Sequence, residues 1–231
     1  MNRPTETTRR ILTLGIVASG LIATLAAQAA GEAIWLHYIF KPLTTLLILT
    51  LVWRTANPVT PRYRNMVMAG IVLSTFGDVF LMLPPAVLAA GFICGLASFL
   101  VAHLFFLRAF TSDVPLLRKV LAPLLYAGIG AINLVILWSG LPAELHVPVP
   151  VYLLCLGAMA AQAASRWLTL NTAASRLAAC GAALFFLSDT LIAYDRFDHP
   201  ISGAEFWILG SYYSALWLIA LSVSDRVKAD Q

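Results

Sequence analysis

The sequence predicts an all-α polytopic membrane protein, a bundle of eight transmembrane helices with both termini in the cytoplasm. Hydrophobic residues fill 60% of the 231 positions, charged residues only 11%, and the mean hydropathy is +0.84. A soluble domain has a far more polar composition. Long apolar stretches recur along the chain, and basic residues gather in every second connection between them. Stretches of this length predict helices, which satisfy their own backbone hydrogen bonds in lipid.

Eight apolar stretches are each long enough to cross a hydrocarbon core of roughly 30 Å as a helix. Their expected bounds are residues 11–30, 35–53, 65–83, 87–110, 120–138, 149–167, 176–194 and 206–223. The first follows Arg9 and Arg10 as a signal peptide would, but it is longer than a signal segment and seven further spans follow. We therefore expect a membrane span there as well.

Polar and turn-forming residues separate these stretches in order. The separators are Glu32, the segment 54–64, the tight turn Pro84–Pro85, the segment 111–119, Glu144, the segment 168–175 and the segment 195–205. Because all connections are short, residues 1–231 are expected to form a single membrane-embedded domain.

The basic residues predict the orientation of the bundle. An even number of spans puts both termini on one side, and the positive-inside rule makes the basic side cytoplasmic. Only Lys41 and Arg196 lie elsewhere. The residues on the basic side are Arg3, Arg9, Arg10, Arg54, Arg62, Arg64, Arg108, Arg118, Lys119, Arg166, Arg176, Arg226 and Lys228. The net charge of +4 therefore reflects topology, and no nucleic-acid partner is expected.

Three ionisable residues lie within predicted spans: Lys41, Asp78 and Asp189. Charge inside a membrane is costly unless it is paired or hydrated, so such residues are functional candidates. Counted from the span ends, all three lie at about 8 to 9 Å depth on the non-cytoplasmic side. We expect them to line one polar cavity. Further candidate cavity residues at similar depths are His37, Tyr38, Ser74, Asn133, Ser188, Tyr212 and Tyr213.

Structural roles also explain several of these residues. Lys41 could bridge Asp78 or Asp189 only to lock helix packing, or extend outward to the lipid headgroups. His103, in the fourth span, is explained equally well by a helix-to-helix hydrogen bond.

Metal and serine chemistry have weak support in this sequence. The four His residues show no HExxH motif and no ligand spacing on a helix face, so no metal ion and no other cofactor is expected. A serine nucleophile would need a neighbouring His base, and Ser188 beside Asp189 has no obvious His partner.

Several short motifs stand out along the chain. They are Lys41-Pro42-Leu43, the run from Gly77-Asp78 to Pro84, Phe92, Gly95, Ser98, Phe99 and His103 at their spacing, Leu187-Ser188-Asp189 and Tyr212-Tyr213. Together and in this order they resemble the motifs of the YhhN family, the bacterial relatives of transmembrane protein 86, and the resemblance covers most of the chain. In place of the polar residue that often follows the paired aromatic residues in this family, the chain has Ser214, Ala215 and Leu216.

This resemblance implies a lysoplasmalogenase in a bacterial cytoplasmic membrane, which hydrolyses the vinyl-ether bond of a lysoplasmalogen to a fatty aldehyde and a glycerophospho-headgroup. Protonation of the vinyl ether and attack by water need an acid and an anionic base, as in glycosidases. Asp78 and Asp189 would fill these roles, with Lys41 keeping one of them ionised. Arg196 is the candidate for the lipid phosphate, although a salt bridge with Asp195 or Asp198 explains it equally well.

Two other functions fit the same residues. A small proton- or ion-coupled transporter could use the Lys41, Asp78 and Asp189 cluster, and helices broken near their centres would favour it. A lipid-binding or assembly protein without catalysis would be favoured by a closed Lys41–Asp78 pair with no adjoining cavity.

Overall fold

The computed structural model describes residues 6–29 and 31–224, apart from the side chains of Glu6 and Glu32, and contains the eight membrane-length helices that the sequence predicts. Arg3, Arg226 and Lys228, counted above with the basic side, lie outside the described residues. The α-helices are α1 (Glu6–Ala29), α2 (Ile34–Trp53), α3 (Pro61–Met82), α4 (Gly91–Phe110), α5 (Leu121–Leu137), α6 (Pro148–Leu170), α7 (Ala173–Phe197) and α8 (Ala204–Leu221). Short 3-10 turns cover Gly31–Ala33, Trp138–Gly140 and Ala143–Leu145.

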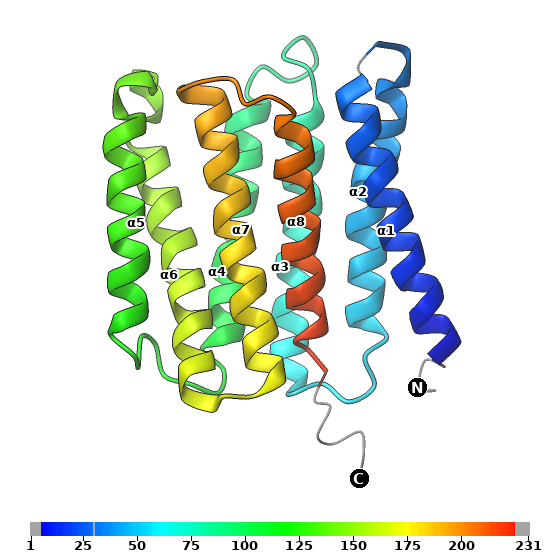
Figure 1. Cartoon of the computed structure of the whole chain (residues 1–231), viewed down its shortest axis with the longest axis vertical. Helices are drawn as coiled ribbons and strands as arrows, with labels where there is room; N and C mark the ends of the chain where they lie inside the picture. Colours follow the sequence, from blue (N-terminus) through cyan, green and yellow to red (C-terminus); the bar gives the residue numbers. More distant parts are fainter. Residues whose placement is uncertain (1–5, 30, 225–231) are drawn as a thin grey trace.

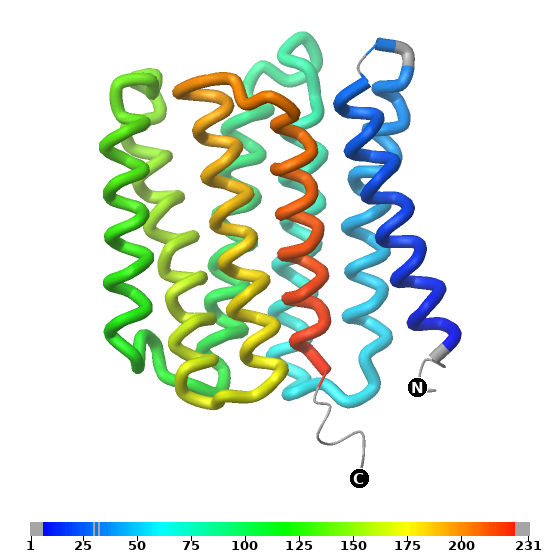
Figure 2. Tube along the Cα trace, in the orientation of Figure 1, coloured from blue at the N-terminus to red at the C-terminus, as the bar shows by residue number. Residues whose placement is uncertain are grey.

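The helices run up and down side by side, with α1 and α5 at opposite edges (Figure 1). Helix α8 packs on α7, α1 and α2, and α4 packs on α3 and α6. Because α6 lies between α4 and α5, the chain passes from α4 to α5 along one end of the bundle (Figure 2). We call this end, where α1 begins and α8 ends, the basal end, and the opposite end the distal end.

Large apolar side chains cover the outside of the bundle. Leu14, Leu124, Val135 and Leu154 are each more than 60% exposed although they lie within long helices. A water-soluble bundle does not expose such a surface, whereas hydrocarbon is its natural solvent. The chain is therefore an integral, multi-pass membrane protein.

Local sequence signals explain several helix ends. Thr60 accepts a hydrogen bond from the Tyr63 backbone at the start of α3, and Pro61 takes the first helical position. Thr172 and Ser175 form a reciprocal capping box at the start of α7. The helix then continues to Phe197, three residues beyond the predicted end at residue 194. Asp189 therefore lies eight residues before the end of α7, compared with five before the predicted end.

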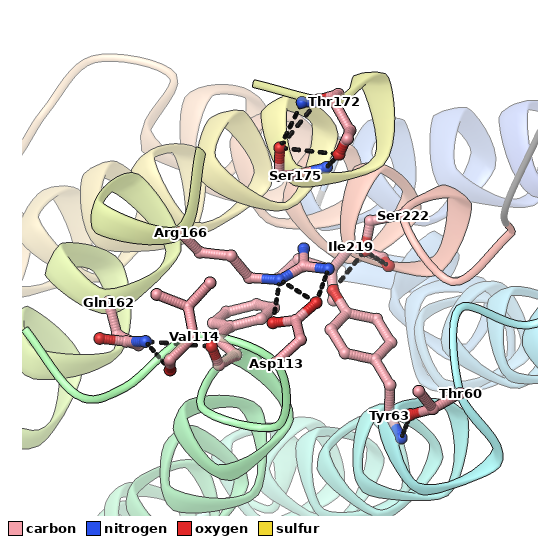
Figure 3. A network of polar contacts seen from close by, with 11 residues as sticks. Thr60, Tyr63, Asp113, Val114, Gln162, Arg166, Thr172, Ser175, Ile219 and Ser222 are labelled. Carbon is pink, nitrogen blue, oxygen red and sulfur yellow. Dashed lines mark hydrogen bonds and ion pairs between the residues drawn. The ribbon is translucent and has the colours of Figure 1, made fainter. Parts of the chain in front are cut away.

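A buried ion pair holds the basal end together (Figure 3). Arg166 of α6 donates two hydrogen bonds from Nε, of 2.8 and 3.0 Å, and one from Nη2, of 2.7 Å, to the Asp113 carboxylate. Its guanidinium lies 4.9 Å from the Tyr63 ring of α3, whose hydroxyl is 2.8 Å from Ser222 Oγ. Arg166 is only 1% exposed. Although the sequence groups it with the basic connections, it anchors α6 to the α4–α5 connection.

Candidate functional site

The first cluster of the site joins α2, α3 and α8 around Asp78. Lys41 Nζ lies 3.8 Å from Asp78 Oδ1. Thr45 and Tyr212 donate hydrogen bonds of 2.9 and 2.8 Å to Asp78 Oδ2. All four residues are buried. One cation and two hydroxyl donors thus satisfy both oxygens of the carboxylate, which favours its ionised form.

Helical spacing brings the donors of this cluster to one carboxylate. Thr45 follows Lys41 by one turn of α2, so both side chains lie on the same face of that helix. Ser74 precedes Asp78 by one turn of α3 and is fully buried, and its hydroxyl has no hydrogen-bond partner within the described residues. This free hydroxyl extends the polar surface next to Asp78.

The second cluster joins α4, α6 and α7 around Asp189. Tyr152 donates a hydrogen bond of 2.5 Å to Asp189 Oδ2, and His103 Nε2 lies 3.8 Å from the same oxygen. His103 is 0% exposed, and neither of its ring nitrogens has a hydrogen-bond partner in the described part of the chain. Asp189 itself keeps 10% of its side chain exposed. No Lys or Arg side chain forms an ion pair with it among residues 6–29 and 31–224.

Aromatic rings separate the two clusters. The Phe185 ring lies 5.5 Å from that of Tyr212, which binds Asp78, and 4.7 Å from that of His103, which lies beside Asp189. Phe99 packs edge to face against both Phe185 and Tyr212, at 6.1 and 5.9 Å. One layer of aromatic rings thus contacts both clusters and forms an apolar wall between them.

A cavity of about 70 Å³ adjoins the second cluster. This volume is enough for a few water molecules. Neither Lys41 nor Asp78 is among its lining residues, so the cavity reaches only Asp189. It is lined by Leu81, Phe92, Leu96, Phe99, Val149, Tyr152, Asp189, Ile192, Ala193 and Phe197. The site thus offers one carboxyl group to an otherwise mainly apolar space.

Arg196 lies at the distal edge of this cavity. Its guanidinium stacks over the Phe92 ring at 4.0 Å and lies 6.0 Å from Phe197, and both rings line the cavity. The expected alternative of a salt bridge with Asp195 or Asp198 is not formed. Asp195 accepts a hydrogen bond from a backbone amide, and Asp198 pairs with His199. The Arg196 charge therefore remains available at the cavity edge.

The charged residues lie at different distances from their helix ends. Lys41 follows the start of α2 by seven residues, Asp78 precedes the end of α3 by four and Asp189 precedes the end of α7 by eight. At a rise of 1.5 Å per residue, these distances are about 10, 6 and 12 Å along the helices. Because α7 continues past the end of its apolar stretch, the helix ends do not mark the membrane surface, and the common depth stays a prediction.

Three of the predicted cavity residues form no hydrogen bond or ion pair with either carboxylate. His37 Nδ1 lies 2.9 Å from the Ala23 carbonyl oxygen and so joins α2 to α1. Tyr38 is 43% exposed on the outside of the bundle. Tyr213 is buried, and its ring lies against Gly20 of α1.

Two further predicted residues join helices near the site without reaching the carboxylates. Asn133 of α5 accepts a hydrogen bond of 2.9 Å from the Tyr194 hydroxyl of α7. Ser188 donates a hydrogen bond of 3.0 Å to the Ile208 carbonyl oxygen, which fixes α7 against α8. Both contacts hold α7, the helix that carries Asp189.

The sequence indicated Thr45 as a polar neighbour of Lys41, but sequence reasoning missed Tyr152 as the partner of Asp189 and left the role of His103 open. Tyr152 carries no charge and belongs to none of the quoted motifs, so nothing in the sequence singled it out. His103 does fall in a motif, and its pairing with Asp189 in place of a hydrogen bond between helices could have been suspected from that signal. Within the described residues, no three His, Cys, Asp or Glu side chains gather as metal ligands.

Comparisons with known proteins identify relatives over most of the chain. A model of the YhhN family matches residues 36–223. The chain is 36% identical over 170 residues to lysoplasmalogenase TMEM86B of Sus scrofa, with 72% of this chain and 66% of that protein covered. It is 32% identical over 188 residues to lysoplasmalogenase TMEM86B of Homo sapiens, with 81% and 75% covered.

A bacterial relative matches over a greater length. The chain is 31% identical over 208 residues to the uncharacterized membrane protein YhhN of Escherichia coli O6:H1, with 90% of this chain and 97% of that protein covered. The chain thus spans about two thirds of the pig protein, three quarters of the human protein and nearly all of the bacterial one. No solved structure matches.

Proposed function

Because the chain belongs to the YhhN family and is similar to proteins named lysoplasmalogenase, we propose that it is a membrane hydrolase that cleaves the vinyl-ether bond of a lysoplasmalogen. The products are a fatty aldehyde and a glycerophospho-ethanolamine or -choline. One observation carries the proposal: Asp189, held by Tyr152 and beside His103, lines an apolar cavity.

The reaction begins with proton transfer from a carboxylic acid to the β-carbon of the vinyl ether, which produces an oxocarbenium ion. Water then attacks the carbon bonded to oxygen and loses a proton to a carboxylate. The resulting hemiacetal gives up its hydroxyl proton and breaks its bond to the glycerol oxygen, which takes up a proton in turn, so that the aldehyde is released. The net change is the addition of one water molecule, and the acid–base logic is that of glycosidases.

Asp189 is the better candidate for the acid. It faces the cavity and has no Lys or Arg partner among the described residues, so it can carry a proton to the substrate. Asp78 is ionised beside Lys41 and bound by two hydroxyl groups. Its negative charge stabilises the oxocarbenium ion across the Phe99 wall, in the manner of a fixed electrostatic group.

The shape of the cavity suits a single-chain lipid. Its apolar lining accepts the start of the hydrocarbon chain, while the headgroup stays at the distal end near Arg196. An arginine binds phosphate oxygens in a bidentate manner. In this proposal the protein lies in the bacterial cytoplasmic membrane with both termini cytoplasmic, and the substrate enters from the outer leaflet.

The alternatives find less support in the helices. Each of α2, α3 and α7 is continuous through the level of its charged residue, whereas transporters often break helices at such sites. The closed Lys41–Asp78 pair by itself would suit a lipid-binding protein without catalysis. The open cavity at Asp189 favours the enzyme.

The test is aldehyde release by the purified full chain, with lysoplasmalogen as substrate and the saturated ether lipid as control substrate. We expect release only from the vinyl ether, and a loss of at least ~10²-fold for Asp189→Asn and for Asp78→Asn. The matched control is Asp198→Asn, a carboxylate on the distal connection. Release from neither lipid by folded protein would refute the enzyme, and activity that survives both site variants but is lost with a chelator would refute this mechanism.

A further inference from the structure

A second cavity, with a partly polar lining, lies at the basal end, opposite to the site at Asp189. Its volume is about 190 Å³, and it lies between the basal ends of α1, α2 and α8. It is lined by Arg9, Leu12, Leu51, Arg54, Thr55, Ala56, Asn57, Ala220, Leu221 and Ser224. The proposed hydrolysis uses none of these residues.

Two arginines from separate elements meet at this cavity. Arg9 belongs to the first turns of α1, and Arg54 directly follows α2. Both are exposed, and neither forms an ion pair within the described residues. Among residues 6–29 and 31–224, no Asp or Glu lines the cavity. Two positive charges around one cavity repel each other unless an anion lies between them, so the cavity favours an anionic ligand.

The rest of the lining is divided into an apolar and a polar part. Leu12, Leu51, Ala220 and Leu221 provide apolar walls, and the polar side chains are those of Thr55, Asn57 and Ser224. A free inorganic anion gains no favourable contact from apolar walls. A phospholipid matches both parts of the lining, because its charged phosphate group is followed by glycerol and hydrocarbon chains.

Local hydrogen bonds hold the cavity walls in place without a ligand. The Val59 amide donates a hydrogen bond of 2.9 Å to the Val223 carbonyl oxygen, which fixes the α2–α3 connection to the end of α8. Thr55 Oγ1 donates to the Leu51 carbonyl oxygen at 3.1 Å. A preformed site loses less entropy on binding than a site that must be ordered first.

The level of the cavity matches that of lipid phosphate. It lies at helix ends, where the apolar surface gives way to polar connections, and the neighbouring Trp53 is 52% exposed at the same level. Tryptophan at a helix end marks the interface between hydrocarbon and headgroups. Arginines just beyond that interface lie where anionic lipids carry their charge.

We propose that this cavity binds the phosphate group of an anionic phospholipid from the leaflet at the basal end, with Arg9 and Arg54 as the phosphate ligands. The lipid's glycerol and upper chain segments pack on the apolar walls. This site is independent of the proposed hydrolysis, because it lies at the other end of the bundle.

The test measures lipid retention by the purified full chain in detergent, using native mass spectrometry. Phosphatidylglycerol, phosphatidylcholine and inorganic phosphate are the three probes. We expect the wild type to retain phosphatidylglycerol at least tenfold better than phosphatidylcholine, and inorganic phosphate not to displace it at equal concentration. Displacement by inorganic phosphate would overturn the lipid in favour of a free anion, and equal retention of both lipids would overturn the site altogether.

A double variant locates the binding. Arg9→Gln with Arg54→Gln is expected to lower phosphatidylglycerol retention at least tenfold. The matched control, Arg62→Gln with Arg176→Gln, removes the same charge from exposed positions at the same end and should change retention less than twofold. Equal losses in the two double variants would mean that surface charge alone attracts the lipid, and would overturn the site. The comparison of wild-type lipids decides the proposal even if a variant fails to fold.

Discussion

Removal of one hydroxyl group tests the proposed role of Asp189 without changing any charge. Tyr152→Phe deletes the donor of the 2.5 Å hydrogen bond to Asp189 Oδ2. The phenyl ring can keep its edge-to-face contact with His103, at 5.3 Å between ring centres. The carboxyl group then loses its only hydrogen-bond donor within the described residues, and its orientation toward the cavity is no longer fixed.

The size of the effect follows from the type of bond. Asp189 becomes a carboxylate as it gives its proton to the substrate, and a hydrogen bond to a charged group contributes about 1.5 to 3 kcal/mol. If the bond positions Asp189 for proton transfer, the rate of aldehyde release should fall about 10- to 100-fold, since 1.4 kcal/mol corresponds to a factor of ten. The assay compares steady-state aldehyde release from lysoplasmalogen, together with thermal unfolding in the same detergent.

Tyr126→Phe is the matched control, because Tyr126 packs against Phe186 and its hydroxyl has no hydrogen-bond partner in the described part of the chain. Its activity should stay within twofold of the wild type. A Tyr152→Phe variant with full activity, alongside an inactive Asp189→Asn variant, would show that Asp189 needs no orientation by Tyr152. If Tyr152→Phe is inactive only because it is unfolded at the temperature of the assay, as the thermal unfolding curve would show, Tyr152 has only a structural role.

Three further predictions test the remaining charges. Lys41→Met leaves the Asp78 carboxylate buried without its cation. This should cost about 3 to 5 kcal/mol of stability and change the pH profile of aldehyde release. Adding Asp78→Asn to the same chain should restore the thermal stability but not the activity. Arg166→Met should lower stability by about 3 kcal/mol, because it leaves Asp113 unpaired at the basal end, and should be visible as a lower unfolding temperature. Pro200→Cys should react with an impermeant thiol reagent from outside the cell only, and labelling from the cytoplasmic side alone would reverse the proposed topology.

The helices were predictable because the apolar stretches that cross the membrane can be read directly from the sequence. Each apolar stretch had to become a helix, since no other open structure satisfies backbone groups in hydrocarbon. The ends were less predictable. Helix α7 begins at a capping box that hydropathy does not register, and it continues through Asp195 and Arg196 to Phe197. Polar residues at a helix end reach water without ending the helix, so a hydropathy boundary stops short of the structural one.

The site was predictable only where it carries charge. Asp78, Asp189 and Lys41 were found because a charge within a membrane span is expensive. The partners of Asp189 carry no such signal: a tyrosine and a histidine in an apolar span look like ordinary packing residues. Nor does the sequence specify which side of a helix faces inward when all its sides are apolar. In α2, His37 and Lys41 face the interior, whereas Tyr38 faces outward.

The glycine beside Asp78 provides a last test of how packing controls the site. A Cβ atom added at Gly77 would lie 2.5 Å from the Phe99 ring, which lines the Asp189 cavity and separates the two clusters. Gly77→Ala must therefore displace this ring or push α3 away from α4, and overpacking of this kind costs about 1 to 3 kcal/mol. We expect aldehyde release to fall at least tenfold, because either movement changes both the cavity and the distance between the carboxylates. Gly128→Ala adds the same methyl group on α5, where nothing lies within 4 Å, and should leave activity unchanged. If Gly77→Ala is as active as Gly128→Ala, the Phe99 wall has no part in catalysis, and the two carboxylates do not act as one unit.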